Sequence, residues 1–493
     1  MADTLIALDQ GTTSSRAMVF NTHGQPLAAH QQPFPQMYPA DGWVEHDPEA
    51  IWSSTVSTAK AALAGVDSTP TALGITNQRE TVVIWDRATG APIHNALVWQ
   101  DRRTAPRCAE IEAAGHGTLI TERTGLLIDP YFSATKLTWL LDHVPGARAR
   151  AMRGELAAGT IDSFLIWRLT GGRVHATDAT NASRTSLFDI HLQKWDEDLL
   201  QLFGIPSSIL PDVKDSAADF GTTDPDVLGA AIPIRGVAGD QQAAAIGQAC
   251  FRPGDLKSTY GTGCFVIVNT GEHPIMSQNR LLTTLAYRLN GKPTYALEGS
   301  IFIAGAAVQW LRDEVGVLAS AAETAERAAR ARDDAQVIMV PAFTGMGAPH
   351  WAPDARAAVF GMTRDTGPNE LSRAALEGVV YQTHDLFAAL AADGRAPSNL
   401  RVDGGMVAND WFVQRLADVL NLNVLRPTVL ETTALGAAYL AGLGAGIYTS
   451  LEQISGQWQA ESEFSPDMDE GDRATRLKRW QACVDAVLSV AAS

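Results

Sequence analysis

The sequence predicts an α/β protein made of two related halves that meet over a cleft. A short apolar run at 5–8 is joined by small polar residues to a second apolar run at 17–20, which is typical of a β-hairpin. The same strand–loop–strand pattern returns about 250 residues later, at 256–260 and 265–268. A chain of 493 residues is too long for one ordinary core, and no long linker divides it. We therefore expect two α/β halves, although their sequences do not visibly repeat.

Further elements follow each predicted hairpin. In the first half, apolar residues with helical spacing over 49–63 predict a helix, and 73–75 predicts a short strand. The run at 232–237 leads into Gly239-Asp240 and then a helix from 243 onward. We place the domain boundary near residue 250, which gives domains 1–250 and 251–493. The later chain is expected to be mostly helical, with helices at 320–332, 369–390 and 410–420.

Composition narrows the class of partner. The 38 Lys and Arg residues against 55 Asp and Glu give a formal charge of −17, which disfavours nucleic acid and anionic lipid surfaces. No apolar stretch approaches the roughly 18 residues of a membrane span, and the N-terminus lacks the pattern of a signal peptide. The four cysteines form no CxxC pair, which argues against a zinc site or a disulfide framework. We expect a cytoplasmic protein without membrane insertion.

The first hairpin loop, from Asp9 to Arg16, has the composition of a phosphate-binding turn. Its backbone N–H groups can converge on phosphate oxygens, Arg16 adds positive charge, and the hydroxyls of Thr12, Thr13 and Ser14 add donors. Asp9 can hold a hydrated Mg²⁺ near those phosphates. The loop lacks the Gly-Lys-Ser/Thr ending of a Walker motif. On its own, it is equally well explained as a polar hairpin turn.

Two other glycine-containing turns fit a nucleotide. The second hairpin carries Gly261-Thr262-Gly263, and Gly404-Gly405 follows an apolar run and precedes a helix. Glycines at a strand end let a flat adenosine approach the backbone closely. Each turn alone is more simply explained as structural. Because the loops at 9–16 and 261–263 occupy corresponding places in the two halves, a shared clamp on the β- and γ-phosphates becomes credible.

A series of motifs along the chain resembles the FGGY carbohydrate kinases of the actin-like ATPase superfamily. They are DQGTTSSR, GITNQRET, YFSATK, GVAGDQQAA, YGTGCF and DGGMVAND, with GWVEHDP at 42–48, TDATNASRT at 177–185 and GMGAPHW at 345–351. The resemblance implies two actin/hexokinase-like (ribonuclease H-like) domains that flank a catalytic cleft. Domain 1–250 would carry the substrate site, the first phosphate loop and the catalytic Asp. Domain 251–493 would carry the second phosphate loop and the adenosine site.

Within this family the substrate motif is most similar to that of the glycerol kinases. TNQRE at 76–80 differs from the GQMHG-like stretch typical of xylulose and related sugar kinases. Arg79 and Glu80 would offer a donor and an acceptor to neighbouring hydroxyls of a short polyol. The resemblance further implies that the glycerol hydroxyls are contacted by Tyr131, Asp240 and Gln241. It also implies that the glycerol carbons pack against Trp99 and Phe265. Without this context, Arg79-Glu80 would be a surface ion pair and the two aromatic residues core packing.

The resemblance also assigns the chemistry. Asp240 would accept the proton of the attacking hydroxyl, and Mg²⁺ near Asp9 would offset phosphate charge. Arg16 and Thr262 would hold the transferred phosphoryl group, and the nucleotide would lie against Gly305, Gln309, Gly405 and Asn409. Composition and spacing alone leave Asp240 an ordinary helix cap.

The expected activity is therefore ATP-dependent phosphorylation of glycerol to glycerol 3-phosphate, in a homodimer or homotetramer by analogy with the family. One alternative is a kinase of another small polyol or sugar. A second alternative is a catalytically inactive, actin-like nucleotide sensor. The presence of both Asp9 and Asp240 disfavours the sensor.

Overall fold

The computed structural model describes residues 3–395, 397–491 and 493. Its N-terminal part is built on a five-stranded sheet in the order β13-β5-β1-β2-β3. Strands β1, β2 and β3 pair antiparallel, whereas β5 and β13 run parallel to β1. Their bounds are Thr4–Gln10 (β1), Ser14–Asn21 (β2), Pro26–Pro33 (β3), Ala72–Asn77 (β5) and Ile234–Gly239 (β13).

A seven-stranded sheet in the C-terminal part repeats this topology. Its order is β16-β17-β15-β14-β20-β21-β22, and the five strands β17-β15-β14-β20-β21 have the order and directions of the first sheet. Strands β16 and β22 extend the two edges. The bounds are Leu256–Tyr260 (β14), Cys264–Gly271 (β15), Leu282–Leu289 (β16), Lys292–Ile301 (β17), Asn399–Asp403 (β20), Asn423–Pro427 (β21) and Ala460–Phe464 (β22). The predicted two-half α/β fold is confirmed.

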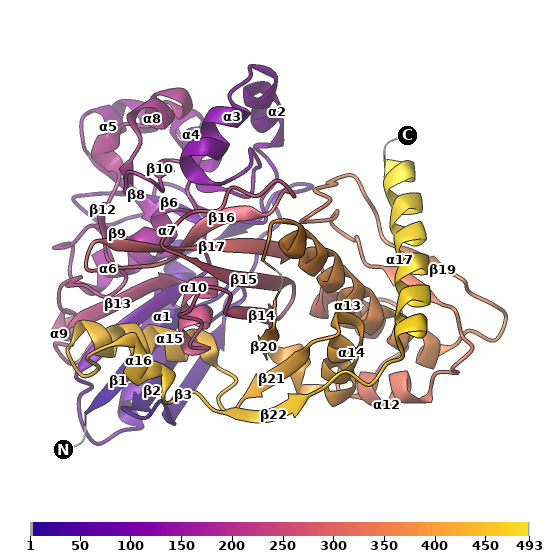
Figure 1. Ribbon diagram of the computed structural model, residues 1–493. Helices are drawn as coiled ribbons and strands as arrows, with labels where there is room; N and C mark the ends of the chain where they lie inside the picture. The colour runs from indigo at the N-terminus through magenta and orange to yellow at the C-terminus, as the bar shows by residue number, and fades with distance from the viewer. Residues whose placement is uncertain (1–2, 396, 492) are drawn as a thin grey trace.

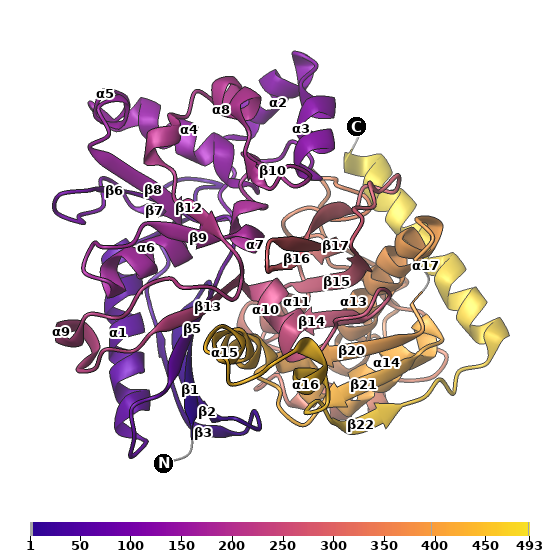
Figure 2. The same cartoon turned by 60° about the vertical axis from the view of Figure 1, so that its left-hand side comes forward.

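Two helices join the halves. Helix α10 (Asp240–Gly247) follows the last strand of the first sheet, and α15 (Thr432–Gly444) follows β21. They pack against each other, and α15 also packs on β13, β5 and β1 of the first sheet (Figure 1, α15 in gold beside the indigo strands). Figure 2 shows the same pairing from another side. The C-terminal part of the chain thus completes the core of the N-terminal sheet, while the proposed division at residue 250 stays a prediction.

Glycines permit this close contact. A Cβ atom at Gly436 would lie 1.8 Å from the carbonyl oxygen of Ala243, and one at Gly74 would lie 2.1 Å from that of Ala437. Both contacts are between backbones, so neither can be relieved by moving a side chain. At these two positions α15 is therefore in direct backbone contact with α10 and with β5.

A smaller layer lies above the first sheet in Figure 1. It contains a four-stranded sheet, β4-β7-β6-β8, covered by helices on its outer side. Its strands are Glu45–His46 (β4), Val82–Asp86 (β6), Ala96–Leu97 (β7) and Leu156–Thr160 (β8). Its helices are Ala105–Ala113 (α2), Gly117–Thr124 (α3), Ser133–His143 (α4), Ala147–Met152 (α5) and Glu197–Phe203 (α8).

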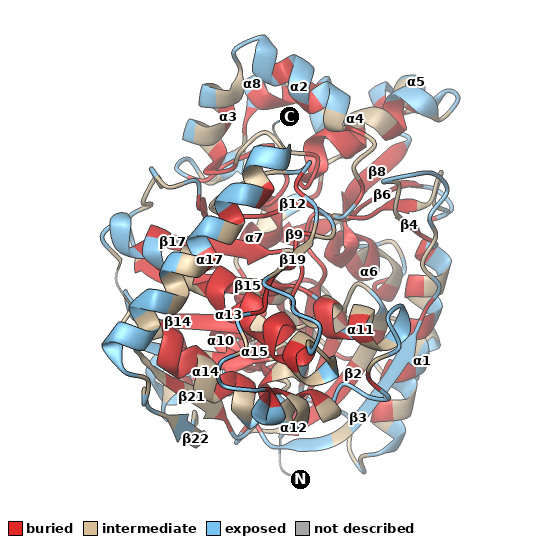
Figure 3. Cartoon of the chain, turned by 90° about the vertical axis from the view of Figure 1, so that its right-hand side faces the viewer, coloured by how far each residue is buried: buried red, intermediate tan, exposed pale blue. Residues whose placement is uncertain are grey.

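The remaining elements surround these three sheets. The strand pairs are β9 (Ala176–Asp178) with β12 (Asp212–Lys214), β10 (Phe188–Asp189) with β11 (Lys194–Trp195), and β18 (Ile338–Val340) with β19 (Ala358–Phe360). The helices include α6 (Ile161–Leu169), α7 (Ala179–Ala182), α9 (Pro225–Leu228), α11 (Gly305–Asp313) and α16 (Leu451–Ser455). In Figure 3 the sheets are buried, and α17 (Glu470–Ala491) lies outermost with mostly exposed turns. Among the described residues, no helix combines the length and the hydropathy needed to cross a membrane.

Most predicted elements are present, with one correction. The helices predicted at 49–63, 369–390 and 410–420 correspond to α1 (Pro48–Ala64), α13 (Pro368–Ala392) and α14 (Asp410–Leu420), while 320–332 holds only the shorter α12 (Glu323–Arg330). The strands predicted at 256–260 and 265–268 are present as β14 and β15. The expectation that the later chain is mostly helical was wrong for 282–301, where β16 and β17 extend the second sheet. Strands such as β17, buried along most of their length, lack the alternation that marks a half-exposed strand.

Candidate active site

The two predicted phosphate loops join the first two strands of each sheet. Asp9, at the end of β1, pairs in register with Arg16 on β2, and Gly11 N–H donates to the Ser14 carbonyl at 2.9 Å. In the second loop, Gly261 N–H donates to the Gly263 carbonyl at 2.9 Å. Each loop therefore closes on itself at the same topological position in its half.

Trp99 connects the two loops. Its indole Nε1 donates to Thr12 Oγ1 at 3.0 Å, and its ring meets that of Phe265, just beyond the second loop, at 6.0 Å and 75°. The ring of Tyr131 also packs against that of Trp99, with 5.6 Å between the ring centroids and an angle of 68° between the planes. Trp99 and Phe265 are both partly exposed. Trp99, Tyr131 and Phe265 thus form a continuous aromatic wall. From the sequence, only Trp99 and Phe265 were expected in such a wall, and Tyr131 was expected to contact a hydroxyl.

A polar cluster faces this wall. The Arg79 guanidinium carbon lies 5.8 Å from the Phe265 ring centroid, and Arg79 Nε lies 3.1 Å from Asp240 Oδ1. Glu80 has a positive φ of 62°, a sparsely populated conformation for a residue with a side chain, and its Oε1 accepts from Arg184 Nε at 2.7 Å. Arg79, Glu80 and Asp240 therefore lie together beside the aromatic wall. The surface ion pair considered from the sequence is ruled out, because Arg79 and Glu80 are almost fully buried.

Asp240 is the first residue of α10, and the N-cap position belongs to Gly239. Its Oδ1 accepts from the N–H of Gln241 at 2.7 Å, while Oδ2 is hydrogen bonded to no described residue. Burial raises the pKa of Asp240 above its ordinary value, although Arg79 and Lys257 oppose that shift. The carboxylate thus has one anchored oxygen and one oxygen available to a substrate.

Asp9 lies near enough to Asp240 for their charges to interact. Burial raises the pKa of Asp9 to about 6, with Arg16 lowering it and Asp240 raising it further. A bound cation would relieve the repulsion between the two carboxylates. Among the described residues, no group of three or more His, Cys, Asp and Glu side chains could hold a metal on its own. Mg²⁺ does not require such a group, because it usually binds through one or two carboxylates, water and substrate phosphates.

Arg16 and Ser14 of the first loop have protein partners. Arg16 forms an ion pair with Glu431, next to the start of α15, and Nη2 donates to Gln31 Oε1 at 3.0 Å. Ser14 Oγ accepts from Gln31 at 2.7 Å. Thr13 is exposed. A phosphate held by Arg16 would have to share that side chain with Glu431 or displace it.

A cavity of about 740 Å³ opens beside the second loop. Five of the predicted nucleotide-binding residues line it, namely Thr262, Gly305, Gln309, Gly405 and Asn409. Asn409 is the N-cap of α14, and its side chain accepts from Phe412 N–H at 3.0 Å. Gly404 has a φ of 93°, and a Cβ there would lie 2.5 Å from the Tyr260 carbonyl oxygen. Gly404 therefore permits the turn, while Gly405 lines the cavity without a side chain to obstruct it. The volume of the cavity suits a nucleotide.

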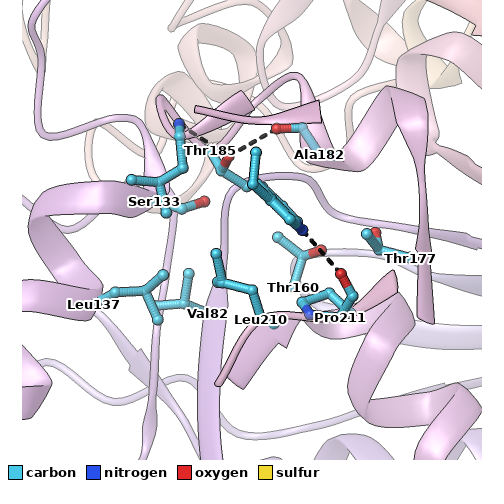
Figure 4. A pocket seen from close by; sticks show the side chains of 12 residues that line it. Val82, Ser133, Leu137, Thr160, Thr177, Ala182, Thr185, Leu210 and Pro211 are labelled. Carbon is cyan, nitrogen blue, oxygen red and sulfur yellow. Dashed lines mark hydrogen bonds between the residues drawn. The ribbon is translucent and has the colours of Figure 1, made fainter. Parts of the chain in front are cut away.

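A second cavity, in the N-terminal half, is much smaller. Figure 4 shows it among apolar side chains together with Ser133, Thr160, Thr177 and Thr185. Its volume of about 10 Å³ is near the lower limit for one water molecule. None of the predicted site residues lines it.

Three charged residues at the site were missed from the sequence. Glu298 on β17 accepts from both Arg79 and Arg184, and Lys257 on β14 donates to the side chain of Gln241. Arg184 stands in the TDATNASRT motif but received no role. Only Glu298 carried a signal, as a charged residue within the largely apolar run of β17, because such residues are seldom buried unless paired.

The comparisons with known proteins agree along the whole chain. The N-terminal domain of the FGGY family of carbohydrate kinases matches residues 4–247, and the C-terminal domain matches 256–445. A glycerol kinase of Methylobacterium nodulans is 61% identical over 495 residues, covering 99% of each chain. Glycerol kinase 1 of Pseudomonas aeruginosa is 60% identical over 494 residues, covering 100% of each chain.

Solved structures show the same fold. The crystal structure of the Plasmodium falciparum glycerol kinase with ADP has a TM-score of 0.90 at 37% identity and covers 99% of this chain and 98% of its own. A xylulose kinase of Lactobacillus acidophilus has a TM-score of 0.88 at 22% identity, covering 100% of this chain and 99% of its own. At that identity the likeness concerns the fold alone.

Proposed function

The chain belongs to the FGGY family of carbohydrate kinases, and from this premise we propose that it transfers the γ-phosphoryl group of ATP to glycerol, giving glycerol 3-phosphate. The observation that carries the proposal is the arrangement of a small polar cluster against an aromatic wall, beside a cavity of nucleotide size. Relatives about 60% identical over the full chain are glycerol kinases. This supports glycerol rather than a larger sugar as the acceptor.

The polar cluster offers both hydrogen-bond donors and hydrogen-bond acceptors to the hydroxyls of a substrate. Arg79 Nη2 donates to Glu298 and to no other described residue, so its second N–H is available to a substrate oxygen. Glu80 Oε2 is hydrogen bonded to no described residue and can accept. Because Lys257 engages Gln241 Oε1, the amide group of Gln241 faces other partners with its N–H donors. Together with Tyr131 and Asp240, these groups suit three hydroxyls on a three-carbon chain, with Trp99 and Phe265 covering its carbons.

The chemical step needs positioning and charge compensation more than covalent help. Asp240 Oδ2 accepts the proton of the glycerol hydroxyl as its oxygen attacks the γ-phosphorus. The raised pKa of Asp240 makes it a better proton acceptor than an ordinary carboxylate. Arg16, Thr262 and the N–H groups of the two loops hold the phosphoryl oxygens, with Thr12, Thr13 and Ser14 as further donors.

Asp9 would hold a hydrated Mg²⁺ together with the ATP phosphates. When bound, the ion supplies positive charge that offsets the charge developing on the phosphates. Asp9 suits this role because it lies near the end of β1 at the first loop, and because its buried carboxylate lies close enough to interact with Asp240 and Arg16. We also propose a cytoplasmic location, which suits an enzyme that consumes ATP, and a homodimer or homotetramer, by resemblance to the family.

Two other activities fit parts of the site. A kinase of another small polyol or sugar would share the loops and the nucleotide cavity, since xylulose kinases share the fold. A nucleotide sensor without catalysis would share the cavity, but it would have no need for an available Asp240 oxygen beside Asp9.

A coupled assay of ADP release tests the proposal. The purified protein would be assayed with glycerol, dihydroxyacetone, erythritol, xylulose and gluconate, with and without Mg²⁺. We expect kcat/KM for glycerol to exceed that of each longer substrate by at least about tenfold, a difference of about 1.4 kcal/mol in transition-state binding. A preference for xylulose or gluconate would assign the chain to a sugar kinase, and ADP release from none of them would favour the sensor.

A further inference from the structure

A chain of alternating charges runs beside the substrate site, and its middle member comes from the other half of the molecule. In order, its members are Asp240, Arg79, Glu298, Arg184 and Glu80. The two ends, Asp240 and Glu80, are the carboxylates that the proposed function assigns to the substrate. Glu298 lies on β17 of the second sheet, whereas the other four residues precede the second sheet in the chain.

Glu298 is completely buried, and both of its oxygens are engaged. Oε2 accepts from Arg79 Nη1, while Oε1 accepts from Arg79 Nη2 at 3.1 Å and from Arg184 Nη2 at 2.8 Å. A residue in this state does not itself contact a substrate. A guanidinium held at both Nη atoms is fixed in orientation, and here the fixed orientation directs Arg79 Nε to Asp240.

The charge on Glu298 is also needed where it lies. Arg79 and Arg184 are both buried, and without a carboxylate between them two cations would face each other away from water. Burial acts to raise the pKa of Glu298, but Arg184 and Arg79 hold that pKa below its ordinary value. Glu298 is therefore ionised and serves as the shared counter-ion of both arginines.

A second residue of the same sheet, Lys257, also orients a side chain predicted to bind the substrate. Lys257 on β14 is buried, and its Nζ donates to Gln241 Oε1 and to Thr259 Oγ1, the latter at 2.8 Å. Two of the side chains predicted to bind substrate, Arg79 and Gln241, are thus oriented by charges that belong to the C-terminal sheet.

We propose that Glu298 is a positioning residue of the substrate site, fixing the Arg79 guanidinium from across the interface between the halves. Substrate binding then depends on how the two sheets meet, because a displacement of β17 would release Arg79. The inference rests on the proposed function for the identity of the substrate and adds a residue to which that function assigned no part.

The test is the substitution Glu298→Gln, which keeps the shape of the side chain and removes its charge. We expect the KM for glycerol to rise at least about tenfold, as for a lost charge-assisted hydrogen bond, while the KM for ATP stays within about twofold. Glu298→Asp provides a second variant that keeps the charge but withdraws the carboxylate from Arg79. It should raise the glycerol KM in the same direction even if Glu298→Gln folds poorly.

Glu377→Gln is the matched control. Glu377 is also a buried carboxylate of the C-terminal half between two arginines, Arg415 at 3.3 Å and Arg476 at 3.5 Å, but it lies on α13 and makes no contact with the polar cluster. It should leave the glycerol KM within about twofold of wild type. Because Glu298 acts through Arg79, Glu298→Gln should also have a smaller effect on the glycerol KM in an Arg79→Ala background than alone.

The outcomes separate the two proposals. Wild-type protein that does not phosphorylate glycerol would overturn the proposed function. Wild-type activity on glycerol, with an unchanged glycerol KM in both Glu298 variants, would overturn the positioning role. Equal increases in Glu298→Gln and Glu377→Gln would also overturn it, because they would show general loosening of the C-terminal half.

Discussion

At the scale of single residues, the site depends on buried charges that are each held by a partner. Asp240 keeps one oxygen on the start of α10 and leaves the other open, while Arg79 is held at both Nη atoms. Motifs in the sequence supplied the residues that the proposed function assigns to the substrate. They did not predict Glu298 or Lys257, because these are contributed by strands of the second sheet, and Glu298 is separated from Arg79 by 219 residues. Such pairings are set by the packing of the halves, and no local pattern identifies the partner of a buried charge.

One buried carboxyl lies outside this site and gives a test of the first half. Asp162 on α6 is buried and accepts from Thr160 Oγ1 at 2.5 Å and Thr177 Oγ1 at 2.6 Å. Burial raises its pKa to about 7, the two hydroxyls lower it, and Asp178 raises it. Because the folded protein holds this proton more tightly than the unfolded chain does, its contribution to stability is complete below about pH 4. That contribution is lost as the pH rises toward about 7.

Asp162→Asn should remove this dependence on pH. We expect the melting temperature of the variant, relative to wild type, to be higher at pH 8 than at pH 5, since Asn has no proton to lose. Differential scanning fluorimetry at both pH values measures this difference in melting temperature. The substitution Asp67→Asn, at an exposed position, is the control. A constant difference between Asp162→Asn and wild type across that range would contradict the assignment.

At the scale of elements, the helix pair α10 and α15 is the closest contact between the two parts of the chain. The sequence predicted the helix that begins near Asp240, and α14 was predicted with its observed bounds. It did not predict that α15, encoded near the end of the chain, packs on the first sheet. The small residues of α15 indicate that some element packs closely against this helix. They do not identify which element that is.

Gly436→Ala tests that contact. The added Cβ would lie 1.8 Å from the Ala243 carbonyl oxygen, so the two helices would have to separate. We expect a loss of about 3 kcal/mol or more in the free energy of unfolding, at the upper end for overpacking. Urea denaturation measures the loss. Gly456→Ala is the control, because its nearest neighbours would lie at 3.6 Å, and a variant pair with equal stability would contradict this account of the interface.

At the scale of the whole molecule, two sheets of the same topology place one loop each beside Trp99, which contacts Thr12 and Phe265. The repeated hairpin pattern in the sequence was enough to predict two halves, and the shared strand order confirms it. The full extent of the second sheet was not predicted, because its buried strands resemble other apolar runs. The arrangement sets Asp240, at the end of the fifth strand of the first sheet, beside both Asp9 and the charges of the second sheet.

The most direct test of the central claim is the turnover of Asp240→Asn with glycerol and Mg-ATP. The amide keeps the size of the side chain but accepts a proton far less readily, so kcat should fall at least about 100-fold, the lower end for a positioned base. Nucleotide affinity, measured by isothermal titration calorimetry, should stay within about threefold of wild type, because the nucleotide cavity does not include Asp240. A kcat close to that of wild type would contradict the role of Asp240 as the proton acceptor.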